Sequence, residues 1–153
     1  AKVARGKRLV QYRHYRRGDV IVSAAGIVAN LFLGAVCTVL FGALGMLADV
    51  VPGAMDALGT LQRMMVFGVF LNFTLAIFNL IPIPPLDGSR LVYHALPERW
   101  GARYLQLGRF GFLVLFATFL VPGLWNVLLW PVDSLTAGAL SLVESYGLPS
   151  VAR

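Results

Sequence analysis

A long stretch without charged side chains is the feature that most constrains the fold of this chain. From Val20 to Leu47 the sequence contains no Lys, Arg, Asp or Glu. A helix needs about 20 apolar residues to cross the hydrocarbon core of a bilayer, and this stretch is longer than that. In the whole chain 58% of the residues are hydrophobic and only 13% are charged, about half the charged share of a typical soluble domain. The pattern predicts an all-α integral membrane protein.

Further apolar runs divide the remainder of the chain into helical segments. The run over 61–81 ends at a group of prolines that begins with Pro82, because proline lacks the backbone donor that a helix needs. Residues 104–121 can form a third span, and the region 123–146, with its tryptophans, is either a broken fourth span or an interfacial hairpin. We therefore predict a bundle of three to four transmembrane helices in a membrane domain over 20–148. Its spans are expected at about 20–47, 61–81 and 104–121, with a broken or interfacial segment at 123–146, followed by a tail over 149–153.

Basic residues are concentrated at the N-terminus. Seven of the thirteen Lys and Arg residues lie in the first 17 positions, within a segment, 1–19, that we expect to be extended or irregular and to lie at the membrane surface. The positive-inside rule places such a cluster on the cytoplasmic side, here of a bacterial inner membrane, where it contacts the lipid bilayer. The net charge of +6 does not indicate nucleic-acid binding, since no recognition motif accompanies it.

Asp87 is the strongest candidate for a chemical role. It follows the proline-broken end of a span and precedes Gly88. Acidic residues beside a span are costly to place and are therefore functional candidates. Two interpretations stay open at this point: Asp87 directs its carboxylate toward the bundle, or it caps a helix that begins at Ser89.

The residues around Asp87 carry a recognisable pattern. The segment Asn79-x-x-Pro82-x-x-x-Leu86-Asp87-Gly88 has five fixed identities, and it resembles the Asn-x-x-Pro-x-x-x-Leu-Asp-Gly signature of the site-2 protease family of intramembrane zinc metalloproteases.

A second segment supports the same resemblance. Residues 23–30 are similar to the family's Ala-Gly-Pro-x-x-Asn helix, with Ile27 in the place of the usual proline. Small residues in this segment, Gly26 and Ala29 among them, allow another helix to approach closely. The resemblance extends from the start of the chain to about residue 120.

The resemblance implies a bundle of site-2 protease type, in which three core helices surround a zinc ion near the cytosolic side and the enzyme cuts transmembrane-helix substrates. Asp87 would be the third zinc ligand. Asn79 would hold the substrate backbone or support the site. Supporting roles are likewise implied for Asn30, Pro82 and Gly88.

The family's other two ligands and its general base come from a His-Glu-x-x-His motif, in which two histidines share one helix face. These 153 residues contain no such motif. His14 is expected to be solvated or to contact headgroups, and His94 to pair with Glu98 four residues on. We expect this chain alone to bind no zinc and to have no complete catalytic site.

Two functional hypotheses follow. In the first, the chain is the C-terminal part of a site-2 protease whose His-Glu-x-x-His helix lies in a preceding stretch. In the second, it is a non-catalytic relative that serves as a structural or assembly subunit of a larger membrane complex.

Overall fold

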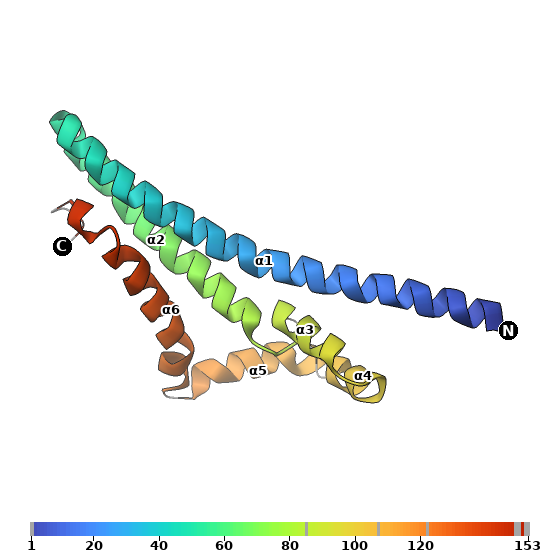
Figure 1. Cartoon of the computed structure of the whole chain (residues 1–153). Coiled ribbons are helices and arrows are strands. Elements are labelled where there is room, and N and C mark those ends of the chain that lie inside the picture. Colours follow the sequence, from blue (N-terminus) through green and yellow to red (C-terminus); the bar gives the residue numbers. More distant parts are fainter. Residues whose placement is uncertain (1, 85, 107, 122, 149–150, 152–153) are drawn as a thin grey trace. The chain divides into compact units, whose positions relative to one another are not determined.

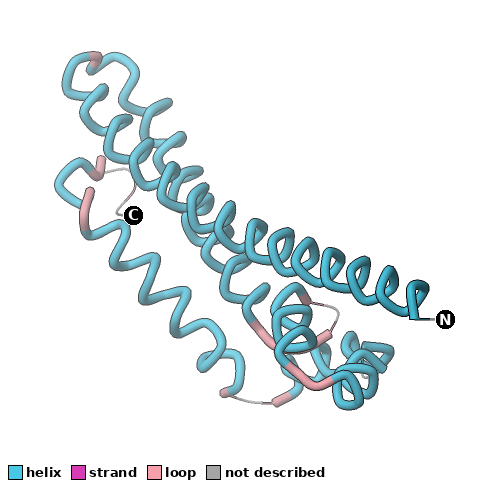
Figure 2. The backbone as a smooth tube through the Cα atoms, turned by 45° about the vertical axis from the view of Figure 1, so that its right-hand side comes forward, coloured by secondary structure: helices cyan, strands magenta, loops and turns pink. Residues whose placement is uncertain are grey.

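The computed structural model describes residues 2–84, 86–106, 108–121, 123–148 and 151 (Figure 1). These residues form helices and connecting turns without a strand (Figure 2), which confirms the all-α prediction. The elements in chain order are α1 (Lys2–Val50), η1 (Pro52–Ala54), α2 (Met55–Leu80), α3 (Asp87–Ala95), α4 (Glu98–Gln106), α5 (Gly108–Leu120), α6 (Leu124–Ser141) and η2 (Glu144–Tyr146).

Two segments of the described chain are long and apolar enough to cross a membrane. They are Gly18–Val50 and Pro52–Leu80, which contain the span predicted at 20–47 and all but the last residue of the span predicted at 61–81. The connection between α1 and η1 is the single residue Val51, because helical structure resumes at Pro52. Asp56 falls in the first turn of α2, where a carboxylate interacts favourably with the positive end of the helix dipole.

The N-terminal basic segment differs from the sequence-based expectation. Residues from Lys2 onward are helical and continue without a break into the first apolar run, whereas we expected an extended or irregular segment over 1–19. Lys and Arg have high helix propensity, and a helix that extends an existing one does not meet the nucleation cost again.

The third predicted span, 104–121, does not form one described helix. It includes the end of α4 and all of α5, and Leu107 between them lies outside the described residues. With 13 residues, α5 is about 20 Å long, short of the roughly 30 Å hydrocarbon core. A third span therefore stays a prediction.

Most of the region 123–146 belongs to α6, which continues through Pro131 to Ser141 and is followed by η2. Residues 124–141 therefore form one helix, not two arms of a hairpin. Proline removes one backbone hydrogen bond, but a helix can continue past it where its surroundings compensate. Whether α6 spans a membrane stays a prediction.

The chain forms two compact units, and each is described by itself. Unit 1 comprises residues 1–28 and 78–122, and unit 2 comprises residues 29–77 and 123–153.

In unit 2, glycines let α1 and α2 pack closely. A Cβ atom at Gly34 would lie 2.5 Å from the Phe73 ring, and one at Gly68 would lie 2.7 Å from the Cys37 sulfur. The Phe73 side chain belongs to a buried cluster with Val69 and Val132. Close approach at small residues is how helices associate where lipid removes the hydrophobic driving force.

Gln62 joins three segments of unit 2. Its side chain is fully buried, and its Nε2 donates to the Phe41 carbonyl at 2.9 Å and to the Tyr146 carbonyl at 3.0 Å. Its Oε1 accepts from the Leu148 amide at 3.1 Å. The turn after α6 also approaches α1 at Gly45, where a Cβ would overlap the Tyr146 carbonyl oxygen. These contacts fix the C-terminal turn against α1 and α2.

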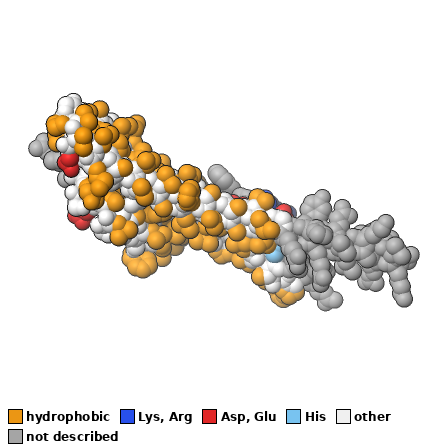
Figure 3. Space-filling view, turned by 45° about the horizontal axis from the view of Figure 1, so that its top comes forward, with side chains coloured by type: hydrophobic (Ala, Val, Ile, Leu, Met, Phe, Trp, Pro, Cys, Tyr) orange, Lys and Arg blue, Asp and Glu red, His pale blue; other side chains and the backbone are white. Residues whose placement is uncertain are grey.

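Large hydrophobic side chains are exposed along both apolar segments. Figure 3 shows them over most of the described surface on one face. Val22 and Val39 on α1 and Phe67 on α2 are each more than 60% exposed. Contiguous exposure of this extent marks a surface that another apolar phase or a partner covers.

Replacing Gln62 by Leu should loosen the C-terminal turn. The change keeps most of the volume but leaves the Tyr146 carbonyl and the Leu148 amide without their side-chain partner, at a cost of about 1 to 3 kcal/mol for a buried group. We expect a lower unfolding temperature and faster proteolysis after residue 141 in detergent solution. Thr60→Val, which removes an exposed hydroxyl bond to Asp56, is the control. Equal behaviour of the two variants would contradict this role of Gln62.

Candidate functional site

The proline segment after α2 positions the candidate site in unit 1. Helix α2 ends at Leu80, and the chain then turns through hydrogen bonds from the Ile83 amide to the Ile81 carbonyl (2.8 Å) and from the Leu86 amide to the Ile83 carbonyl (2.9 Å). Proline cannot continue the helical bonding pattern. The chain is therefore redirected, and α3 begins at Asp87.

Gly88 allows α3 to begin directly against the end of α2. A Cβ atom at this position would lie 2.5 Å from the Leu80 carbonyl oxygen and 2.8 Å from that of Asn79. Backbone atoms cannot move aside as the end of a flexible side chain can. Only glycine fits here, so the Leu-Asp-Gly pattern has a steric reason in this fold.

A tyrosine on α4 holds the proline segment from the other side. The Tyr104 hydroxyl donates to the Pro82 carbonyl at 2.7 Å. Pro84 is buried, and a Cβ at Gly108 would lie 3.3 Å from its Cβ. The segment is thus packed between the ends of three helices.

The Asp87 carboxylate lies beside the glycine of the small-residue segment on α1. A Cβ built at Gly26 would stand 3.7 Å from Asp87 Oδ2, an ordinary contact distance. Asp87 occupies the first turn of α3, and the residue before it, Leu86, is the N-cap and makes no side-chain capping bond. The interpretation of Asp87 as the cap of a helix that begins at Ser89 is therefore wrong. Its side chain has no hydrogen bond or ion pair with any residue in the described ranges.

A second contact places α3 antiparallel to α1. His94 Nε2 lies 3.7 Å from Asp19 Oδ2, with the two side chains 9% and 49% exposed. Asp19 precedes Gly26 by seven residues, and His94 follows Asp87 by seven, so the two contacts lie two turns apart on both helices. The His94 imidazole and the Asp19 carboxylate attract each other electrostatically when the imidazole is protonated.

Ser23 lies on the same α1 face, between Asp19 and Gly26. Its side chain is 1% exposed, and its hydroxyl oxygen has no hydrogen-bond partner within the described part of the chain. A buried hydroxyl without a partner is costly. This polar atom was not anticipated from the sequence, because a serine among alanines in an apolar run indicates only close helix packing.

The expected pairing of His94 with Glu98 on one helix is wrong. Helix α3 ends at Ala95, and Glu98 begins α4 after Pro97, so the two residues do not share a helix. The residue before a proline is disfavoured in helical conformation. His94 instead lies close to Asp19 and to the Tyr93 ring.

The remaining predicted site residues are divided between the two units. The Asn79 carbonyl lies at the Gly88 contact in unit 1, and its side chain is half-buried. Ala29 and Asn30 belong to unit 2, where Ala29 is exposed and Asn30 half-buried. The roles predicted for these residues stay predictions.

The described residues alone do not make a zinc site. No group of three His, Cys, Asp or Glu side chains with metal-binding geometry occurs among them. A catalytic zinc takes three protein ligands and keeps one position open. Asp87 is suited to be one of these three ligands, because it is a carboxylate without another partner among the described residues. The other two ligands are not supplied by the described residues.

Comparison with known proteins identifies the family. The pattern of peptidase family M50 matches residues 39–121, more than half of the chain and including the segment from Asn79 to Gly88. The chain belongs to peptidase family M50, the site-2 protease family. The resemblance read from the sequence is thereby confirmed.

Two relatives have names in keeping with this family. The chain is 35% identical over 140 residues to "Putative zinc metalloprotease YwhC" of Bacillus subtilis, an alignment that covers 88% of this chain and 59% of the relative. It is 36% identical over 83 residues to a "Putative zinc metalloprotease" of Helicobacter pylori, covering 50% of this chain and 23% of the relative. The chain thus spans about three fifths of the first relative and a quarter of the second. No solved structure gave a significant match.

The contact between α1 and α3 predicts a crosslink. After Cys37→Ala removes the native cysteine, Gly26→Cys and Asp87→Cys should be joined by a short thiol-specific crosslinking reagent, since a Cβ at position 26 would lie 3.7 Å from Asp87 Oδ2. Val28→Cys with Asp87→Cys is the control, because Val28 is exposed. Its side chain points about 200° away from position 26 around the axis of α1. The shift in gel mobility reports the crosslink. Equal yields from both pairs would contradict the placement of Asp87.

Proposed function

We propose that this chain is the part of a membrane-embedded zinc endopeptidase that carries the third metal ligand, Asp87. The observation that supports this most is the placement of Asp87 at the start of α3, beside Gly26 and without a partner among the described residues. The remaining ligands and the general base would come from a His-Glu-x-x-His motif outside these 153 residues. The chemistry such a site supplies is activation of a water molecule for peptide hydrolysis.

The two long apolar helices support the membrane setting of the proposal. Gly18–Val50 and Pro52–Leu80 each exceed the length needed to span a bilayer, and their exposed faces carry large apolar side chains. The substrate class would be proteins with a transmembrane helix. The seven basic residues at the start of α1 support a cytoplasmic N-terminus in a bacterial inner membrane.

The structure of unit 1 gives Asp87 a defined task in this proposal. The Gly88 contact fixes the start of α3 against α2, and the contact with Gly26 fixes it against α1. The backbone of Asp87 is thereby held by packing against α2, and its carboxylate lies against α1. A ligand held in this way stays in place before the metal binds.

Replacing Asp87 by Asn in the complete protein should abolish cleavage. The amide keeps the size of the side chain but loses its negative charge. Changes to residues that only support metal ligands already cost 10- to 100-fold, so we expect a loss of at least about a hundredfold. The measurement is cleavage of a synthetic single-span substrate in proteoliposomes, together with zinc content per protein.

Asp56→Asn serves as the matched control for this experiment, since Asp56 is an exposed carboxylate in the first turn of α2. It should cleave at the unaltered rate. Undiminished cleavage by the Asp87→Asn variant would remove Asp87 from the site. If the complete protein neither binds zinc nor cleaves, a non-catalytic subunit of a membrane complex becomes the better account.

A further inference from the structure

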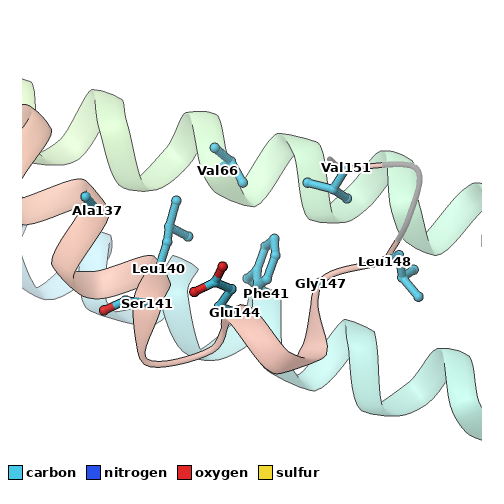
Figure 4. Close-up of a pocket in the computed structure, with 9 residues that line it drawn as sticks. All are labelled: Phe41, Val66, Ala137, Leu140, Ser141, Glu144, Gly147, Leu148 and Val151. Atoms are coloured by element: carbon cyan, nitrogen blue, oxygen red, sulfur yellow. The ribbon is translucent and has the colours of Figure 1, made fainter. Parts of the chain in front are cut away.

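Unit 2 contains a cavity that the proposed peptidase site does not use. Its volume is about 580 Å³, within the range of roughly 300 to 1,000 Å³ found for small-molecule sites. Figure 4 shows residues of α1, α2, α6 and the C-terminal turn around it. The lining side chains are mainly apolar, with Phe41 from α1, Val66 from α2 and Leu140 from α6.

The wall formed by the C-terminal turn is held in place. Gln62 bonds to the carbonyls of Phe41 and Tyr146 and to the amide of Leu148, and Phe41 and Leu148 both line the cavity. All three of these bonds lie within unit 2. The cavity is therefore formed by the fold before any ligand enters.

One carboxylate is directed into this apolar space. Figure 4 shows the Glu144 carboxylate between the side chains of Leu140 and Phe41. Glu144 is exposed to the outside as well, and its carboxylate makes no hydrogen bond or ion pair with the residues that the structure describes. The other polar lining side chain, Ser141, donates its hydroxyl to the Gly138 carbonyl at 2.8 Å. The described lining contains no Lys, Arg or His.

We propose that this cavity binds one acyl chain of a phospholipid whose headgroup carries a primary ammonium, as in phosphatidylethanolamine. The apolar walls match the chain, and Glu144 at the exposed edge matches the ammonium. An anionic headgroup would instead bring negative charge close to the carboxylate without a basic residue in the lining to offset it.

The volume favours a lipid chain over a peptide helix. A helix is about 10 to 12 Å across with its side chains and rises 5.4 Å per turn, so little more than about one turn would fill 580 Å³. A single turn would leave its backbone groups without partners. A flexible acyl chain has no such groups to satisfy. The occupant that the cavity fits is therefore the lipid.

The test measures retained lipid on the complete protein and needs no catalysis, so its outcome is independent of the peptidase proposal. The protein is placed in nanodiscs of equal phosphatidylethanolamine, phosphatidylcholine and phosphatidylglycerol with matched chains. After transfer to mild detergent, native mass spectrometry counts the lipids that remain bound. We expect phosphatidylethanolamine to exceed phosphatidylcholine by about fivefold, because the quaternary ammonium of choline has no N–H to donate to Glu144 and one net hydrogen bond is worth about this factor.

Two variants separate the roles of charge and shape. Glu144→Gln should abolish the preference for phosphatidylethanolamine while lipid stays bound. Ala137→Trp, which fills the cavity from its exposed edge, should remove the bound lipid. The controls are Asp133→Asn and Leu135→Trp, two exposed positions on α6 outside the lining, and both should behave as the unaltered protein does.

Three results would overturn the proposal. The first is equal retention of the three lipids, or a preference for phosphatidylglycerol, by the unaltered protein. The second is undiminished lipid on the Ala137→Trp variant. The third is displacement of the retained lipid by a single-span peptide, which would make the cavity a peptide site.

Discussion

The candidate site depends on how the chain leaves α2. Prolines without backbone donors end that helix, and two tight turns then bring α3 so close to α2 that Gly88 lies against the carbonyl oxygens of Asn79 and Leu80. A side chain at position 88 would push the start of α3 away. Asp87 is the residue immediately before this contact, so its position relative to α2 is fixed by backbone atoms. Proline and glycine together thus place the backbone of Asp87.

Close approach at glycine residues is also found in unit 2. Glycines at 34 and 68 allow α1 and α2 to approach, and Gly45 allows the C-terminal turn to approach α1. Polar groups within these helices are satisfied locally, as where Thr38 bonds to the Gly34 carbonyl and Asn72 to that of Gly68. Local bonding is the solution expected where neither lipid nor a packed neighbour offers partners. Gln62 differs from these two residues, since it bonds across three segments.

The sequence predicted what depends on single residues and short patterns. The charge-free run after Val20 and the break at Pro82 are local signals, and both lie where the structure has an apolar helix and a helix end. The reason for Gly88 depends on how closely the chain folds back after Leu80, which the residue pattern does not specify. The burial of Ser23 and the bonding of Gln62 depend on segments distant in sequence, so no local pattern could show them. The helical start of α1 was missed because Gly6, Gly18 and the tyrosines and histidine among the basic residues have low helix propensity, although the Lys and Arg residues around them favour a helix.

The central claim is that Asp87 is a zinc ligand of a peptidase of family M50. Its most direct test is X-ray absorption at the zinc edge of the complete, metal-loaded protein, compared with the Asp87→Ala variant. The account predicts that the variant loses one carboxylate oxygen, at about 2.0 to 2.2 Å, from the zinc shell, or loses the metal altogether. A fully loaded variant with an unchanged shell would contradict the claim.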